Sequence, residues 1–285
     1  MRDRAESAGW AWRSVASAAL EQRLASDELQ VETFIAMRYA PPRAREIARD
    51  VKGFAPDRIV LLPLYPQFST TTTRSSLEEW HKEAANIGLT APTSTVCCYP
   101  EDRGLITAQA KLIGEAIGKL PAGARFRLLL SAHGLPKRVV AAGDPYQAQV
   151  EQTAKAIVAA LGRTDLDWAV CYQSRVGPLQ WIGPATDGEI KRAGAEGLGV
   201  VIAPIAFVSE HSETLVELDI DYAELAKHAG VPAYFRVPAV GTQSDFIDGL
   251  ARLVTEAMGA VGVRAGAGTR SCPANCDQCA LEAAA

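Results

Sequence analysis

The chain lacks any run of the ~18–20 apolar residues that a membrane-spanning helix needs. It also lacks an excess of positive charge, since 29 Lys and Arg stand against 33 Asp and Glu. A broad basic surface is therefore not expected, and the composition argues against nucleic acid as a partner. Residues 1–21 mix charges with Trp10 and Trp12 and lack the apolar middle of a signal peptide. We therefore expect a cytoplasmic protein, and peripheral contact with a membrane stays open.

The balance of residue types is that of an ordinary globular protein, because 48% of the 285 residues are hydrophobic and 22% are charged. This length suits one large domain or two domains of ordinary size. Six cysteines are present. In a reducing compartment they point to a metal site or to buried thiols rather than to a disulfide framework.

Apolar runs of strand length alternate with helical patterns along the chain, which predicts an α/β protein built from βαβ units with parallel sheets. The predicted strands are Val31–Met37, Arg58–Leu64, Thr95–Cys98, Arg125–Ser131, Asp167–Gln173 and Gly199–Ala206. The predicted helices are Pro42–Val51, Ser75–Asn86, Leu105–Leu120, Pro145–Leu161, Thr186–Gly194, Glu213–Ala226 and Gln243–Met258.

The best boundary between two lobes is the stretch 118–124, which contains Pro121 and Gly123. We expect an N-terminal lobe over residues 1–120 and a C-terminal lobe over residues 121–262, whose last helix packs back on the first lobe. A Gly- and Ala-rich stretch then leads into a cysteine-bearing segment over residues 263–285.

His133 follows a predicted strand and precedes Gly134, at the edge of the sheet where α/β proteins place their sites. An imidazole there is well suited to accept protons near neutral pH. The alternative is a histidine that only hydrogen-bonds its own loop. Neighbouring carboxylates would raise the pKa of His133 and burial would lower it, and the sequence alone does not decide between them.

An acidic stretch places Glu213, Glu217 and Asp221 at intervals of four residues, which puts them along one side of a helix. Glu210 and His211 come just before them. Such a stripe can pass a hard divalent cation between oxygen ligands without holding it tightly. The alternative is a solvated acidic face of a helix.

Two loops have groups that could hold an acidic, flat ligand. The loop from Pro63 to Thr73 leads into a helix, and its backbone N–H groups could bind a carboxylate such as a propionate; ordinary capping is the alternative. The loop after Gln173 contains Arg175 and Trp181, which could contact a carboxylate and stack on a ring. Its alternative is a loop fixed by a core tryptophan.

Cys272, Cys276 and Cys279 form a C-x3-C-x2-C pattern near the end of the chain. Three thiols at this spacing suit a metal or an iron–sulfur cluster, and zinc is the main rival. A fourth ligand must come from elsewhere, and Cys97 and Cys98 are the candidates. Cys171 is interpreted as a buried strand residue.

Four segments of the chain are similar, in order and spacing, to the signature segments of ferrochelatases. They read PLYPQFSTTTT from Pro63, SAHGLPKRVVAAGDPY from Ser131, CYQSRVGPLQWIGPAT from Cys171 and PIAFVSEHSETLVELDIDY from Pro204. The resemblance extends from about Val31 to Met258. It implies two doubly wound, Rossmann-like lobes with a porphyrin in the cleft between them. It also implies a lyase that inserts Fe²⁺ into protoporphyrin IX to give protohaem, with release of two protons.

The resemblance implies a role for each matching residue. His133 matches the family's invariant histidine, which accepts pyrrole protons or delivers the metal, and Glu213 matches its carboxylate partner across the porphyrin. Glu217, Asp221, Glu210 and His211 match the residues of a metal pathway. The residues that match the porphyrin-binding positions are Arg38, Tyr39, Tyr65, Ser69, Gln173, Ser174, Arg175, Trp181 and Phe207. A bent porphyrin exposes its nitrogen lone pairs, and contacts at its edge supply the strain.

The cysteine tail resembles that of ferrochelatases with a [2Fe–2S] cluster, in which the fourth ligand comes from the first lobe. In animal members that ligand follows the PLYPQ motif, where this chain has Thr70. Cys98 is our choice for the fourth ligand, with Cys97 second. The cluster is expected to be structural, because metal insertion is not a redox reaction, and the protein to be a monomer or a homodimer.

Two departures from the family are visible. Residues 1–12 do not resemble the strand ending in LGGP with which ferrochelatases open, so the first lobe is expected to lack a βα unit and a substrate lip. Arg74 stands where the family usually has Gly, which would cost about 1 kcal/mol at a positive φ. The alternatives are a catalytically impaired porphyrin- or haem-binding remnant, a ferrochelatase specific for coproporphyrin and, ranked low, a cobalt chelatase.

Overall fold

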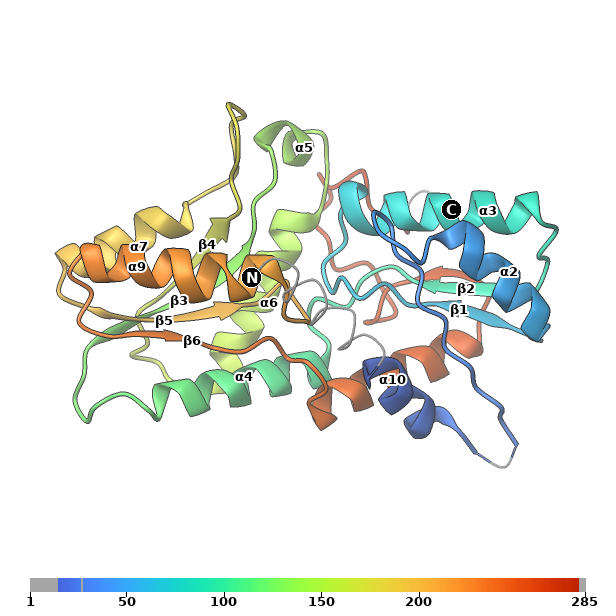
Figure 1. Cartoon of the computed structure of the whole chain (residues 1–285), viewed down its shortest axis with the longest axis horizontal. Coiled ribbons are helices and arrows are strands. Elements are labelled where there is room, and N and C mark those ends of the chain that lie inside the picture. The colour runs from blue at the N-terminus through green and yellow to red at the C-terminus, as the bar shows by residue number, and fades with distance from the viewer. Residues whose placement is uncertain (1–14, 27, 282–285) are drawn as a thin grey trace.

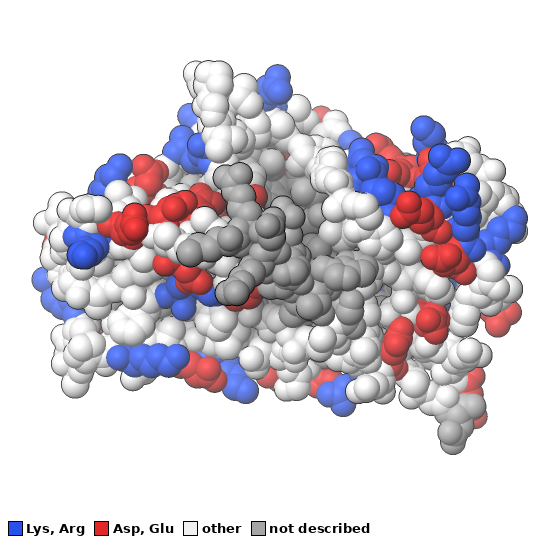
Figure 2. Space-filling model, viewed as in Figure 1, with Lys and Arg blue, Asp and Glu red and all other residues white. Residues whose placement is uncertain are grey.

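The computed structural model of the protein describes residues 15–26 and 28–281, and Figure 1 shows two lobes set side by side. Each lobe contains a parallel sheet covered by helices. On the face seen in Figure 2, Lys and Arg are interspersed with Asp and Glu over both lobes. No helix within residues 15–26 and 28–281 combines the length and the apolar character needed to cross a bilayer.

The first sheet has three parallel strands in the order β1-β2-β7. The elements of this lobe are α2 (Ala44–Phe54), β1 (Ile59–Leu61), η1 (Thr70–Arg74), α3 (Ser75–Asn86), β2 (Thr93–Val96), α10 (Ser244–Met258) and β7 (Gly262–Arg264). Helices α2 and α3 lie on one face of this sheet and α10 on the other (Figure 1). Ile47, Ile59 and Trp80 join α2, β1 and α3 in one buried cluster, which fixes the helices to the sheet.

The second sheet has four parallel strands in the order β4-β3-β5-β6. Its elements are α4 (Arg103–Ile117), β3 (Phe126–His133), α5 (Lys137–Ala141), α6 (Tyr146–Leu161), β4 (Trp168–Gln173), α7 (Thr186–Ala195), β5 (Gly199–Pro204), α8 (Ser212–Leu215), η2 (Glu217–Asp221), α9 (Tyr222–His228) and β6 (Tyr234–Arg236). Successive residues of β3 point to opposite faces, so Leu128 and Leu130 pack with α4 and α6, while Leu129 packs with α7 and α9. Apolar side chains on both faces explain the continuous apolar runs.

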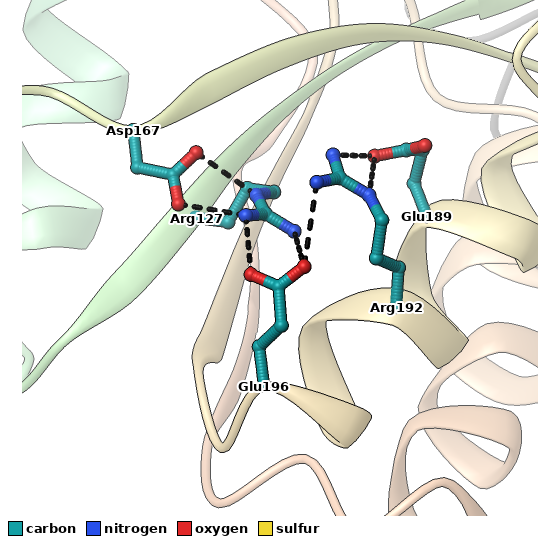
Figure 3. Close-up of polar contacts among 5 residues, drawn as sticks. All are labelled: Arg127, Asp167, Glu189, Arg192 and Glu196. Carbon is teal, nitrogen blue, oxygen red and sulfur yellow. Dashed lines mark hydrogen bonds and ion pairs between the residues drawn. The ribbon is translucent and has the colours of Figure 1, made fainter.

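Charged residues join the elements at the amino end of β3 (Figure 3). Arg127, only 4% exposed, donates to Asp167 over 2.9 Å and to Glu196 over 2.8 Å. Arg192 pairs with both Glu189 and Glu196 and extends the network along α7. The Arg127 guanidinium holds the pKa of the Glu196 carboxyl below its usual value, although burial opposes this. This end of the lobe is therefore fixed by ion pairs, and the carboxyl ends of the strands lie at the opposite edge.

Helices α4 and α10 connect the two lobes where they cross. A Cβ on Gly104 would lie 2.9 Å from the Cα of Gly249, so neither position accepts a side chain without a shift. Beside the crossing, Asp102 caps α4 by accepting from Leu105 N at 3.1 Å, and it pairs with Arg252 of α10. Glycine is therefore required here for close approach of the backbones.

The α/β class with parallel sheets and two lobes is confirmed, and most predicted helices and strands lie within a few residues of their predicted bounds. The lobe bounds 1–120, 121–262 and 263–285 stay predictions. Two observations refine them. Helix α4, within the predicted N-terminal lobe, packs on β5 and α6 of the second lobe. After α10, the chain returns to the first lobe and adds β7 to β2, across the predicted boundary at residue 262.

The predicted strand Val31–Met37 is wrong. Among the described residues it makes one isolated bridge, from Met37 to Arg43, and otherwise has no strand partner. An apolar run becomes a strand only where a neighbour takes its backbone hydrogen bonds. A groove of about 1150 Å³ separates this extended segment from β1. The predicted loss of the LGGP strand concerns residues 1–12, which lie outside the described residues.

The expectation of one helix over Glu213–Ala226 is wrong, and the positive φ on which a cost at Arg74 depends is absent. The predicted helix Glu213–Ala226 is divided into α8, the π-helical segment η2 and α9, so the spacing of its carboxylates is not that of one α-helix. Arg74 has φ −58°, an ordinary helical value, so replacing glycine by arginine here carries no backbone strain. The short strands β6 and β7, of three residues each, were not predicted.

Candidate active site

The carboxyl ends of β3 and β4 lie side by side and place His133 opposite Gln173. After β5 the chain turns into α8, which brings Glu213 to the same edge. The Nε2 atom of His133 lies 3.5 Å from Oε1 of Glu213, and each side chain is 37% exposed. The other ring nitrogen, Nδ1, is 2.6 Å from Gly134 O, so in the neutral ring Nδ1 donates and Nε2 faces the carboxylate as an acceptor.

The pair alters both pKa values. Burial lowers the pKa of His133, but the hydrogen bond and charge of Glu213, the Gly134 carbonyl and the charge of Glu217 together raise it above 6.5. Burial raises the pKa of Glu213, but the hydrogen bond and charge of His133 and the charge of His211 together lower it below 4.5. The structure thus answers what the sequence left open: the net effect is to favour a protonated imidazole beside an ionised carboxylate.

The short distance differs from what the resemblance implied, namely His133 and Glu213 on opposite faces of a porphyrin. A flat ring in van der Waals contact on both faces needs about 7 Å between the atoms above and below it. The observed 3.5 Å leaves no room for a ring. A porphyrin can therefore lie between these side chains only after one of them has turned away.

Glu217 is held by several donors rather than free in a ladder of carboxylates. It accepts from Ser174 N at 2.7 Å, Ser174 Oγ, Gln173 Nε2 at 3.1 Å and Tyr222 Oη at 2.9 Å. Gln173 is fully buried and also donates to Glu213 O at 2.8 Å. Gln173 and Ser174 thus anchor Glu217, and their contact with a porphyrin stays a prediction. Asp221, by contrast, is exposed.

Glu210, a residue of the predicted metal pathway, makes an ion pair with Arg236. Its Oε1 accepts from Arg236 Nη1 at 2.6 Å and from Ala239 N at 2.9 Å, which fixes the loop after β5. Arg236 also pairs with Asp219 at 2.7 Å. His211 caps α8: its Nδ1 accepts from Glu213 N at 3.1 Å, and its ring packs edge-on against Phe207 at 4.8 Å. Oε1 of Glu210 is therefore bound in an ion pair, while its buried Oε2 has no hydrogen-bond partner among the described residues, and its role in a metal pathway stays a prediction.

The groove of about 1150 Å³ brings together predicted residues from both lobes. Those that line it are Arg38, Tyr39, Tyr65, Phe207 and His211. The guanidinium of Arg38 lies 4.8 Å from the Tyr39 ring centre and pairs with Glu79 at 3.3 Å. His133 and Glu213 are not among its lining residues, but the contact between His211 and Glu213 joins the groove to the pair.

Ser69 lies in a loop whose polar groups already have partners. Asp144 Oδ2 accepts from Ser69 Oγ at 3.0 Å, Thr70 N at 2.7 Å and Thr70 Oγ1 at 2.7 Å, and Ser69 Oγ accepts from Thr71 N at 3.2 Å. Ser69 itself is 1% exposed. The Asp144 carboxylate thus takes Thr70 N and the Ser69 hydroxyl, and the binding of a propionate by this loop and a porphyrin contact by Ser69 stay predictions.

Arg175 and Trp181 cover the turn after His133. A Cβ on Gly134 would lie 3.0 Å from Arg175 Cγ and 3.3 Å from the Trp181 ring, so glycine allows the two loops to pack closely. Backbone hydrogen bonds from Gly134 N to Gln173 O and from Ile182 N to Leu135 O join the same loops. Porphyrin contacts by Arg175 and Trp181 stay predictions.

The C-terminal thiols are all buried and form one cluster. Burial raises the pKa of Cys272 to about 12, and the hydrogen bond from Gln149 opposes it. Gln149 also interacts with Cys98, and the charge of Cys98 acts on Cys272, so Cys98 lies beside the C-terminal thiols. The described residues contain no three His, Cys, Asp or Glu side chains arranged to hold one metal ion. The donor chemistry nevertheless suits a thiolate-bound cluster.

Three residues that support these sites were not predicted. Asp144 holds the loop at Ser69 and caps α6 through Tyr146 N at 2.9 Å. Tyr146 interacts with the His133 backbone, and Gln149 contacts the thiols. Only Asp144 had a signal in the sequence, since Asp-Pro before a helical pattern is typical of an N-terminal cap.

The family model named Ferrochelatase matches residues 10–258 of the chain. A ferrochelatase of Caulobacter vibrioides is 55% identical over 258 residues, covering 88% of this chain and 73% of the relative. A ferrochelatase of Phenylobacterium zucineum is 53% identical, covering 92% and 76%. Among solved structures, SirB from Bacillus subtilis with Fe3+ superposes with a TM-score of 0.59 at 14% identity, over 90% of this chain and 91% of SirB, which shows a shared fold. The chain belongs to the ferrochelatase family, the lyases that insert ferrous iron into porphyrins for haem synthesis.

Proposed function

We propose that this ferrochelatase inserts Fe²⁺ into protoporphyrin IX and that His133 and Glu213 handle the two protons that leave the ring. The observation that carries the proposal is the contact between His133 at the end of β3 and Glu213 in α8, next to the groove. The groove is shared by both lobes, as a site for a flat ring in an α/β protein requires. Arg38, Tyr39 and Phe207 offer it a cation and aromatic faces.

Substrate entry and proton transfer are coupled in this proposal. A ring that enters between His133 and Glu213 separates them, and the imidazole then loses the carboxylate that raises its pKa. A histidine with a lowered pKa is neutral and can accept a pyrrole proton on Nε2. Glu213, on the other side of the ring, then loses the imidazole that lowers its pKa, so its carboxylate can accept the second pyrrole proton.

The path of Fe²⁺ runs from the exposed Asp221 towards Glu213. Glu217 lies between them in sequence, but its four hydrogen bonds make it a fixed support rather than a mobile ligand. The π-helical segment η2 between them is the type of irregular helix that occurs at functional sites. Carboxylate oxygens bind Fe²⁺ weakly enough to release it to the porphyrin nitrogens.

For the C-terminal segment we propose a [2Fe–2S] cluster held by Cys98, Cys272, Cys276 and Cys279. Cys97 and Cys98 are both buried, and the interaction of Gln149 with both Cys98 and Cys272 supports this ligand set over one with Cys97. Such a cluster would supply a covalent cross-link between the segment and the first lobe, and no electrons for the reaction. A cytoplasmic location, peripheral membrane contact and a monomer or homodimer stay predictions.

The test is haem formation by the purified protein from Fe²⁺ and protoporphyrin IX without oxygen, with a parallel assay on coproporphyrin. His133→Ala should lose at least 99% of the rate, since general base catalysis contributes ~10²–10⁴-fold. His81→Ala on the exposed face of α3 is the matched control and should match wild type. Porphyrin binding without turnover in wild type would favour the impaired remnant. A fully active His133→Ala would refute the assignment of the base.

A further inference from the structure

Two segments that are far apart in the sequence meet at the amino end of α6. One is the cleft loop, residues 65–74, which begins at Tyr65 in the groove. The other is the thiol segment, residues 271–279, which contains the three C-terminal cysteines. The side chain of Gln149, fully buried on α6, lies between them. The fold thus places one amide between the groove wall and the thiols.

Both polar atoms of the Gln149 amide make hydrogen bonds. Its Oε1 accepts from Phe68 N of the cleft loop at 2.8 Å, and its Nε2 donates to Cys272 Sγ at 3.0 Å. A flipped amide would present N–H to N–H and oxygen to sulfur, so both bonds exist only in this orientation. A buried N–H without an acceptor is costly, which makes Phe68 N dependent on Gln149.

A second set of contacts ties the same two segments together. Arg74 donates through Nη1 to Gln278 Oε1 and through Nη2 to Gln278 O at 2.6 Å. Gln278 N donates to Gly143 O at 3.2 Å. A Cβ on Gly143 would overlap Asp277, so the thiol segment can pack here only because residue 143 has no side chain. The thiol segment therefore contacts the cleft loop directly at Arg74 and packs on the chain before α6 at Gly143.

Order in the cleft loop affects the groove. Tyr65 precedes the contact with Gln149, and Tyr39 Oη donates to Thr71 O at 3.5 Å. Tyr39 and Tyr65 both line the groove. A loop that loses its bond at Phe68 thus loosens two aromatic side chains of the wall.

We propose that Gln149 is a positioning residue that couples the thiol segment to the cleft loop, so that the thiols determine how firmly the groove wall is held. A Cys272 sulfur that is held in place keeps Nε2 bonded and Oε1 directed at Phe68 N. When that sulfur is removed, the amide turns and the loop opens locally. Only the identity of the group that the thiols bind rests on the proposed cluster. The hydrogen bonds that make the coupling join residues of this chain and do not depend on it.

The test is hydrogen–deuterium exchange of the peptide covering residues 65–74, in a double-mutant cycle on the full chain. Gln149→Met keeps the length of the side chain and removes both bonds, and Cys272→Ala removes the sulfur. Each single variant should speed exchange in this peptide roughly fivefold, the loss of one hydrogen bond. The double variant should be no faster than either single one, because both remove the same link.

Gln152→Met is the matched control. Gln152 lies one turn further along α6 and donates to Ser271 O at 2.8 Å, so it contacts the thiol segment without touching sulfur or the cleft loop. In the Gln152→Met protein, the peptide covering residues 65–74 should exchange at the wild-type rate. Unchanged exchange in Cys272→Ala, or effects that add in the double variant, would overturn the coupling. If both variants unfold, Gln149→Glu replaces them, because it keeps an acceptor for Phe68 N but has no donor for Cys272. It should leave exchange of peptide 65–74 slow while thiol reactivity at Cys272 rises. Faster exchange in this peptide together with higher thiol reactivity would also overturn the coupling.

The cluster is measured separately, as iron and acid-labile sulfide per chain and as visible charge-transfer absorbance. Absence of iron and sulfide from protein purified without oxygen would end the cluster proposal and leave the exchange result standing. If the cluster is present, Gln149→Met should shift its reduction potential, because an N–H donor to sulfur tunes an iron–sulfur centre. Gln152→Met should leave the potential unchanged.

Discussion

Replacing Glu213 by Gln should lower the pKa of His133. The substitution keeps the shape and burial of residue 213, and burial opposes the protonated imidazole. It removes the carboxylate 3.5 Å from Nε2, whose hydrogen bond and charge are the two main influences favouring protonation. Two unit charges 4 Å apart interact by about 4 kcal/mol at an effective dielectric constant of 20, and exposed pairs contribute about 0.2–1 kcal/mol.

Both side chains of the pair are 37% exposed, so solvent screening places the interaction near the lower of these figures. We expect a change of about 1 kcal/mol, or roughly fivefold in the protonation equilibrium of His133. The measurement is NMR titration of the imidazole C–H signals, assigned with His133→Ala. Glu224→Gln, an exposed carboxamide substitution on α9, is the control. An unchanged or raised His133 pKa in Glu213→Gln would refute the ion pair as its cause.

The same pair makes a pH-dependent contribution to stability. Because the folded pKa of His133 is raised, its contribution is fully present below 6.5 and is lost as pH rises through the folded value. Because the folded pKa of Glu213 is lowered, its contribution is present above 4.5 and is lost as pH falls through the folded value. The difference in urea midpoint between wild type and Glu213→Gln should therefore be largest between pH 4.5 and 6.5. A difference that grows above this window would contradict the assigned directions.

Three further substitutions test the fold and the supports of the site. Arg127→Met should lower the free energy of unfolding by about 2 kcal/mol in urea, because two half-exposed carboxylates lose a buried partner. Gly249→Ala should destabilise by about 1–3 kcal/mol at the crossing of α4 and α10, whereas Gly114→Ala, with open space at its Cβ, should be neutral or stabilising. Asp144→Ala should raise KM for the porphyrin more than it lowers kcat, since the loop at Ser69 loses its acceptor; an unchanged KM would contradict that support.

The sequence predicted the elements whose pattern is local. The strand Arg125–Ser131 and the helix Ser75–Asn86 were recognisable because apolar periodicity and end signals lie within each segment. Val31–Met37 has a strand's composition but no described neighbour to pair with, and pairing is not a local property. The π-helical segment η2 depends on how its ends are packed, so even spacing of carboxylates could not reveal it.

For the site, the resemblance identified His133 and Glu213, and the structure brings them together. The resemblance could not reveal the hydrogen bonds that the signature segments make with one another. Asp144 reaches Ser69 across 75 positions, and Gln149 reaches Phe68 across 81 and Cys272 across 123. Contacts at such separations are set by the meeting of α6 with the first lobe. The motif residues Gln173 and Ser69 therefore bind other motif residues, where the resemblance had assigned them to the porphyrin.

The closed pair also makes porphyrin binding depend on pH. Because 3.5 Å between His133 and Glu213 excludes a ring, binding between them must first separate an imidazolium from a carboxylate. As pH rises through the raised pKa of His133, the imidazole loses its charge and this separation becomes easier. Affinity of wild type for protoporphyrin IX, measured by fluorescence without metal, should therefore increase roughly fivefold over that range relative to Glu213→Gln. The ratio of the two proteins cancels the titration of the porphyrin's own carboxylates. A ratio that does not change with pH would mean that the ring binds without opening the pair, and both residues would then act from the same side of it.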